Sequence, residues 1–167
     1  FDLVSPGVGF NYELDNSAAL YGGVYRGMST PGPRSAAKSG VQEEKSMGYE
    51  LGYRYQSPKI SYDFGAFLTD FDNLIATDAG LGATENSKNI GEAEVFGFEA
   101  QVSYDPLGGS GSELSLPMYI SATWTDATLT STITEGGGDD IFAGATDGSQ
   151  MPYMPDWQFA AGVALAK

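Results

Sequence analysis

Hydrophobic and polar residues alternate along the stretch from Val95 to Tyr104, and much of the remaining chain repeats this pattern. One set of alternate positions is apolar and comprises Phe96, Phe98, Ala100, Val102 and Tyr104. The other set is mostly small or polar and comprises Val95, Gly97, Glu99, Gln101 and Ser103. A period of two residues is typical of a β-strand whose two faces meet different surroundings. The stretch therefore predicts a strand that separates an apolar medium from a wet one.

Six other segments alternate in the same way and predict further strands. Their approximate ranges are 8–14, 18–27, 44–56, 60–69, 114–124 and 157–165. The segment 18–27 is the hardest to orient, because Tyr21 and Tyr25 lie on one side and Leu20 and Val24 on the other. In the segment 60–69, Phe67 falls on the side that is otherwise polar. The chain thus predicts an all-β fold of about seven strands.

The connections between these segments alternate between short and long. The short ones lie near 15–17, 57–59 and 105–113, and the long ones near 28–43, 76–89 and 128–156. An antiparallel up-and-down sheet with this register has one rim of turns and one rim of loops, which is the asymmetry of outer-membrane barrels. The pattern favours an up-and-down transmembrane β-barrel, of which this chain supplies about seven strands.

The polar side of the predicted strands helps to choose between lipid and a protein core as the apolar medium. It carries Glu50, Arg54, Asp63 and Glu99, which would be costly in a dry core but are ordinary in a water-filled lumen. Many aromatic residues also lie near strand ends, as interfacial girdles require. We therefore expect these four side chains to face a lumen. A soluble β-sandwich with half-polar strands remains an alternative at this point.

Composition and charge exclude several classes of function. The 167 residues include no Cys and no His, which removes thiolate metal sites, cysteine nucleophiles and the commonest general base. No run of 18 apolar residues occurs, so the sequence predicts no transmembrane helix. The formal net charge of −14 disfavours nucleic acid as a partner. We expect no enzymatic activity, no catalytic residue and no cofactor.

Three cations in or beside the first long connection are candidate ligand contacts, namely Arg26, Arg34 and Lys38. They could meet an anionic chelate through charge-assisted hydrogen bonds, or they could be scattered solubilising charges. The acidic pairs Asp139–Asp140 and Glu43–Glu44 are interpreted as solvated loop charge instead of a general acid and base. Residues 138–142 resemble one copy of a calcium-binding repeat, but such sites need stacked copies, so we predict no metal site.

Several motifs, in order along the chain, resemble those of TonB-dependent outer-membrane receptors. Asn89-Ile90-Gly91 followed by Gly97-Phe98-Glu99 is similar to the signature N-I-G-x-x-x-x-x-G-x-E of that family. The segment 47–53, Met-Gly-Tyr-Glu-Leu-Gly-Tyr, resembles its Y-E-x-G-x element. Further segments similar to those of the family are 21–31, 64–74 and 151–155. Within the family, these segments most resemble the ferric-citrate type of receptor.

The resemblance implies a roughly 22-stranded barrel closed around an N-terminal plug, with residues 1–167 forming part of that single barrel domain. The plug, the TonB box and the terminal strand are expected to lie outside this chain. The implied function is energy-coupled uptake of a ferric siderophore or ferric citrate across the bacterial outer membrane. The implied partners are membrane lipid, the ferric chelate, and TonB through the missing N-terminal region. A passive porin-like or structural barrel, and less so a soluble glycan-binding sandwich, are the alternatives.

Overall fold

The structure is a computed structural model that describes residues 4–31, 40–77, 87–133, 142 and 144–167. Nine strands form from these residues. Their bounds are β1 Gly7–Glu13, β2 Ala18–Ser29, β3 Glu44–Gln56, β4 Ile60–Asp72, β5 Ile75–Thr77, β6 Ser87–Asn89, β7 Ala93–Tyr104, β8 Met118–Leu129 and β9 Trp157–Val163. Among the described residues, no helix is long and apolar enough to cross a membrane.

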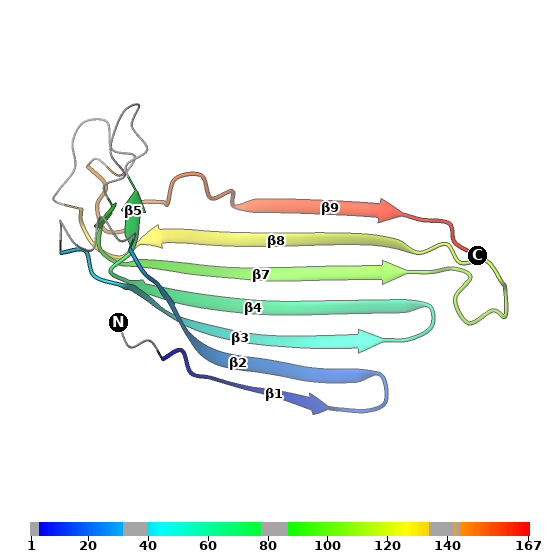
Figure 1. Ribbon diagram of the computed structural model, residues 1–167. Helices are drawn as coiled ribbons and strands as arrows, with labels where there is room; N and C mark the ends of the chain where they lie inside the picture. Colours follow the sequence, from blue (N-terminus) through cyan, green and yellow to red (C-terminus); the bar gives the residue numbers. More distant parts are fainter. Residues whose placement is uncertain (1–3, 32–39, 78–86, 134–141, 143) are drawn as a thin grey trace.

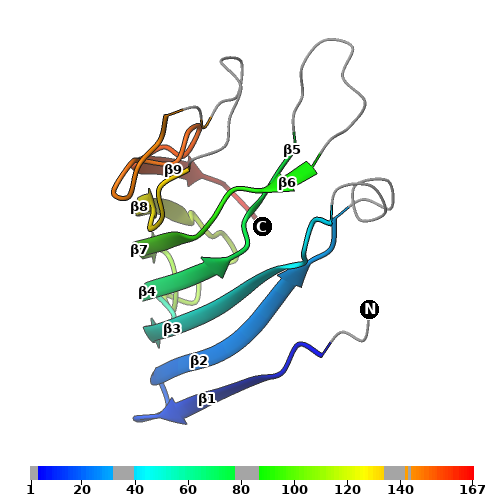
Figure 2. The same ribbon diagram turned by 90° about the vertical axis from the view of Figure 1, so that its left-hand side faces the viewer.

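Seven of the strands form one antiparallel sheet in the order β1-β2-β3-β4-β7-β8-β9. Each strand pairs with the next long strand along the chain, and β5 and β6 form a separate two-stranded ribbon. The long connections gather at one end of the sheet and the turns at the other (Figure 1). We call these ends the loop rim and the turn rim. Figure 2, viewed from the loop rim, shows that β5 and β6 stand at that end.

The register aligns the apolar positions of all seven strands into continuous rows. One such row runs through Phe10, Gly22, Leu51, Ala66, Phe98, Trp124 and Trp157. Because side chains alternate across a strand, every residue two positions away from this row lies on the same side of the sheet. We call this side the apolar face and the opposite side the polar face.

The apolar face is uncovered by protein in the part of the chain that the structure describes. Leu51 is 59% exposed, Phe10 54% and Phe98 51%, although all three lie in the middle of their strands. Apolar surface in water costs about 25 cal/mol per Å² relative to an apolar medium. A single-layered sheet with such a face needs a covering, and the described residues do not form the second layer that a soluble sandwich requires (Figure 1).

The sequence predictions for β3, β4 and β7 agree closely with the structure, whereas the range predicted for β8 was wrong. That strand begins at Met118 instead of Leu114 and continues to Leu129. Pro117 has no N–H to donate to a ladder, and the Leu116 N–H donates to the Asp105 carboxylate at 3.1 Å instead. The alternation of Leu114 and Leu116 with polar residues therefore belongs to the connection between β7 and β8.

The orientation of β2, which the sequence left open, is decided by glycines on neighbouring strands. Tyr21 and Tyr25 lie on the polar face, where a Cβ atom added at Gly52 or Gly48 would overlap their rings. Phe67 also lies on the polar face, as expected, and its ring covers Gly97 with 2.5 Å between the ring and the position of an added Cβ. On the polar face, these aromatic rings thus lie over glycines of the next strand.

A small hydrophobic core lies at the loop rim and was not predicted. We call it the rim core, and its buried members are Ile90, Ala93, Leu129, Ile133 and Phe142. Phe71, Leu74, Ala145 and Met151 pack against it. The ribbon β5–β6 was likewise missed, because the sequence predicted an unbroken loop over 76–89. Strands of three residues are too short for alternation to reveal them.

Candidate functional site

The centre of the polar face holds a cluster made by Tyr21, Arg54 and Asp63. Arg54 and Asp63 are cross-strand partners on β3 and β4, and the Arg54 Nε–H donates to the Asp63 carboxylate at 2.6 Å. Tyr21 reaches across β3 because its own partner there is Gly52, and its hydroxyl donates to the other Asp63 oxygen at 2.6 Å. The Arg54 guanidinium lies 5.1 Å from the centre of the Tyr21 ring, within the range of a cation–π contact.

Further carboxylates share this face. The register places three glutamates on the same side of the sheet as Asp63, namely Glu13, Glu50 and Glu99. The side chains of Glu50 and Glu99 are exposed. A hollow beside the cluster is lined by Tyr21, Arg54, Asp63, Gly65, Glu99, Ala100, Gln101, Ser121, Ala122 and Thr123. The structure thus places all four residues predicted to face a lumen on one side of the sheet, which is rich in hydrogen-bonding groups and predominantly acidic.

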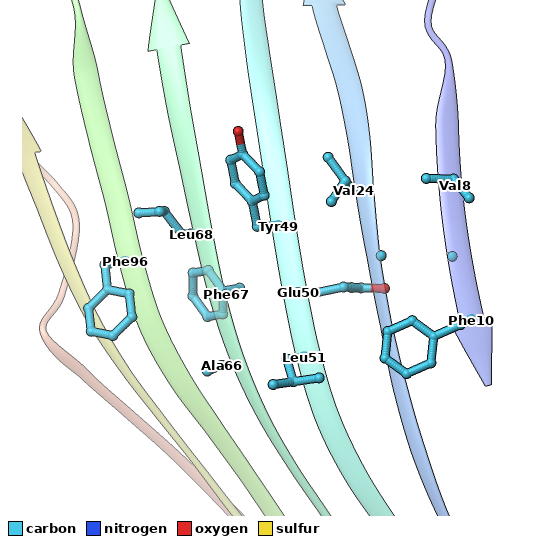
Figure 3. Close-up of a pocket in the computed structure, with 12 residues that line it drawn as sticks. Val8, Phe10, Val24, Tyr49, Glu50, Leu51, Ala66, Phe67, Leu68 and Phe96 are labelled. Atoms are coloured by element: carbon cyan, nitrogen blue, oxygen red, sulfur yellow. The ribbon is translucent and has the colours of Figure 1, made fainter. Parts of the chain in front are cut away.

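The apolar face carries a hollow of a different kind. Figure 3 shows large side chains from β1, β2, β3, β4 and β7 around it, and the labelled residues on this face are Val8, Phe10, Val24, Tyr49, Leu51, Ala66, Leu68 and Phe96. Ala66, whose side chain is only a methyl group, leaves space between the larger side chains, whereas the Phe10 ring covers Gly22. Near the turn rim the same face becomes aromatic, and Tyr55 and Tyr62 stack with 5.0 Å between ring centres.

The predicted cationic ligand contacts fall in different places. Arg34 and Lys38 lie outside the described residues. Arg26 lies in β2, where it pairs with Met47 and shares the side of Val24. Glu43 precedes β3. The pKa of its carboxyl is held below the ordinary value, mainly by a hydrogen bond to its own backbone and next by Lys45 at 3.1 Å. The positive charge of Arg26 lowers that pKa further.

The Asn-Ile-Gly motif has a clear structural role at the loop rim. The Asn89 side chain hydrogen-bonds the backbone of the β2–β3 connection at Gln42 and the start of its own β4–β7 connection at Asn73. Ile90 is 5% exposed and belongs to the rim core. Gly91 has a φ of 121°, which side-chain-bearing residues rarely adopt, and an added Cβ would overlap Ser131.

Within the described ranges, no group of three His, Cys, Asp or Glu side chains is placed to hold a metal ion. Asp139 and Asp140, which belong to the segment that resembles a calcium-binding repeat, lie outside those ranges. The candidate site is therefore the two-sided sheet itself, with one apolar face, one hydrogen-bonding face and a structured loop rim.

A family model described as "TonB dependent receptor-like, beta-barrel" matches residues 1–166. The chain belongs to the TonB-dependent receptor β-barrel family. The fold is accordingly an antiparallel transmembrane barrel wall, and the seven-stranded sheet is an open part of it with edges at β1 and β9. This assignment agrees with the resemblance that the motifs indicated. No curated protein matches the chain.

Solved structures of transporters share the fold of this TonB-dependent receptor chain. The ferric citrate transporter FecA in the unliganded form is 26% identical with a TM-score of 0.65, over 95% of this chain and 22% of that one. The FrpB iron transporter from Neisseria meningitidis (F3-3 variant) is 15% identical with a TM-score of 0.55, over 74% of this chain and 20% of that one. The copper transporter OprC is 19% identical with a TM-score of 0.54, over 73% and 20% respectively.

The chain therefore spans about a fifth of the length of the solved transporters that it matches.

Two contacts in the site of this TonB-dependent receptor chain were not predicted from the sequence. Tyr21 was noted only as a strand residue, although Gly52, its partner on β3, was a signal that its ring could cross that strand. Asn89 was noted only as part of a motif, and no local pattern points to Gln42, which lies 47 positions away.

Proposed function

We propose that this chain is part of an energy-coupled receptor of the bacterial outer membrane that takes up a ferric siderophore or ferric citrate. The observation that carries the proposal is the similarity to the ferric citrate transporter FecA, which is 26% identical over 95% of the chain. The matches to FrpB and OprC, below 25% identity, support the barrel fold alone. Membership of a receptor family favours energy-coupled uptake over a passive porin-like barrel.

The two faces of the sheet fit separate tasks in such a receptor. The apolar face would contact membrane lipid, which supplies the covering that the exposed Leu51 and Phe98 lack. The polar face would line the lumen, so that Glu50, Arg54, Asp63 and Glu99 project toward the plug. We propose that residues 1–167 belong to a single barrel domain that closes around this plug. In this proposal, the plug of the same receptor engages TonB.

The ligand would approach from the loop rim. Arg34 and Lys38 remain proposed contacts for an anionic ferric chelate, because charge-assisted hydrogen bonds to carboxylate or catecholate oxygens are strong. Arg26 has a less favourable position for this role, since its strand position shares the apolar face with Val24 and Met47.

The test is a binding titration of the receptor that contains this chain, purified from outer-membrane fractions, against ferric citrate and a panel of ferric siderophores. We expect saturable binding of one chelate and a loss of roughly tenfold or more when Arg34 and Lys38 are replaced by Ala, from two charged hydrogen bonds. Lys59→Ala at the turn rim is the matched control and leaves binding unchanged. A folded receptor that binds no iron chelate would refute the proposed substrate class.

A further inference from the structure

The bases of the long connections meet at the loop rim around one side chain, that of Asn89 at the end of β6. The Gln42 N–H donates to Asn89 Oδ1 at 2.8 Å, and Asn89 Nδ2 donates to the Gln42 carbonyl at 3.1 Å. The same Nδ2 donates to the Asn73 carbonyl at 2.8 Å. The amide of Asn89 thereby uses its acceptor and both donor hydrogens on two backbone segments that are 47 and 16 positions away.

A second contact joins the same two connections independently of Asn89. The Ile75 N–H at the start of β5 donates to the Glu44 carboxylate at the start of β3, with a distance of 2.9 Å. Glu44 lies two residues from Gln42, and Ile75 lies two residues from Asn73. The entry to β3 and the entry to β5 are therefore held together at two points.

The third connection is joined to this assembly on the other side of Asn89. The Glu92 N–H donates to Ser131 Oγ at 2.8 Å, and the Thr130 N–H donates to the Glu92 carbonyl at 3.0 Å. Gly91 permits this approach, because a side chain there would overlap Ser131. Its carbonyl accepts from the Leu74 N–H at 2.8 Å. The segment 89–92 thus contacts the first long connection before β3, the start of its own connection after β4, and the third long connection after β8.

The rim core lies beneath these contacts and gives them a hydrophobic basis. Leu129 is 1% exposed and Ala93 2%, whereas residues in the middle of the same sheet are half exposed on the apolar face. Segments that are densely buried together and share hydrogen bonds unfold locally as one cooperative unit. The loop rim has both, since the rim core includes residues of the second and third long connections and the hydrogen bonds at Gln42 and Glu44 join the first to them.

We propose that these contacts make the bases of the three long connections a single cooperative unit, with Asn89 as its positioning residue. In this unit, loosening one base loosens the other two. A ligand that orders one long connection consequently stabilises the bases of all three. The Asn of the Asn-Ile-Gly motif serves to hold the loop bases in register and makes no contact with a ligand.

The test is amide hydrogen exchange of the ligand-free receptor that contains this chain, followed by mass spectrometry, so the outcome does not depend on which ligand is transported. In Asn89→Ala, we expect exchange to be about fivefold faster or more in the segments 41–44, 73–75 and 129–133, from the loss of net hydrogen-bond energy. Exchange in the central parts of β3 and β7 should stay at the wild-type rate. Asn16→Ala at the turn rim is the matched control and leaves all of these segments unchanged.

Glu44→Ala opens the same unit from the first connection and gives a reciprocal test. We expect faster exchange at 89–92 and 129–133, although the hydrogen bond of the Glu44 side chain goes to Ile75, which lies in neither segment. If each substitution accelerates only its direct hydrogen-bond partners, the cooperative unit does not exist. Uniform acceleration through the strands would equally refute it. Should Asn89→Ala fail to assemble, Glu44→Ala by itself decides between these outcomes.

Discussion

The two faces of the sheet are built by the same strands and yet follow opposite rules. On the apolar face, Leu51 and Phe98 are large and exposed, and the Phe98 ring packs against Phe96 and Trp124. On the polar face, Arg54 and Asp63 are joined by a 2.6 Å ion pair and Tyr21 donates to the same carboxylate. Residues one position apart thus lie on surfaces of opposite character. One sheet therefore combines a face that needs an apolar covering with a face that is held by its own polar contacts.

The largest effect expected from this comparison follows from placing a charge on the apolar face. Leu51→Arg puts a guanidinium near the middle of a lipid-facing strand, which costs about 2–4 kcal/mol at the bilayer midplane. The measurement is the free energy of unfolding of the receptor in lipid bilayers, by denaturant titration. Detergent micelles should show a smaller loss, because their thin apolar layer lets the side chain reach water.

Thr123→Arg is the control on the opposite face at a similar height. Thr123 pairs with Glu99 and lines the polar hollow, so an added cation meets carboxylates and water there. We expect a change in the free energy of unfolding within about 0.5 kcal/mol, the usual range for surface substitutions. Equal losses for Leu51→Arg and Thr123→Arg would show that the two faces do not meet different media.

The second effect concerns the space that glycine leaves under an aromatic ring. Gly52→Ala adds a Cβ that overlaps the Tyr21 ring, so the ring must move and its hydroxyl leaves Asp63. Overpacking of this kind costs about 1–3 kcal/mol. Gly65→Ala is a close control, because Gly65 is the cross-strand partner of Gly52 and its added Cβ lies 3.5 Å from the Tyr21 hydroxyl. Denaturant titration should find Gly65→Ala nearly neutral, and a neutral Gly52→Ala would show that Tyr21 is free to move.

The alternation of side chains was sufficient to predict most strands, because each strand separates two media and a shift of one residue would exchange its faces. The range of β3 agrees with the sequence prediction for this reason. The prediction for β8 was wrong at both ends. At its start, alternation alone does not register that Pro117 lacks an N–H or that Asp105 captures the Leu116 N–H. Local chemistry overrides the pattern there.

The candidate site was predictable only in part. The shared side of Glu50, Arg54, Asp63 and Glu99 follows from period two within each strand, together with the strand order. The Tyr21 contact depends on the register between β2 and β3, which no single segment encodes. The rim core and the Asn89 contacts join residues that are far apart in the sequence, and short ribbons such as β5–β6 leave no periodic signal. Such features require the assembled sheet.

The smallest effect is expected for the ion pair on the polar face. Arg54 and Asp63 have side-chain exposures of 59% and 31%, so solvent screens their attraction. A double-mutant cycle with Arg54→Ala and Asp63→Ala, followed by denaturant titration, should give a coupling of about 0.2–1 kcal/mol that falls with added salt. Tyr21→Phe keeps the ring under the guanidinium and removes only the hydroxyl bond, so it separates the two contacts of Asp63. A coupling above about 2 kcal/mol would mean that this face is shielded from water, and the division of the sheet into a lipid side and a wet side would then need revision.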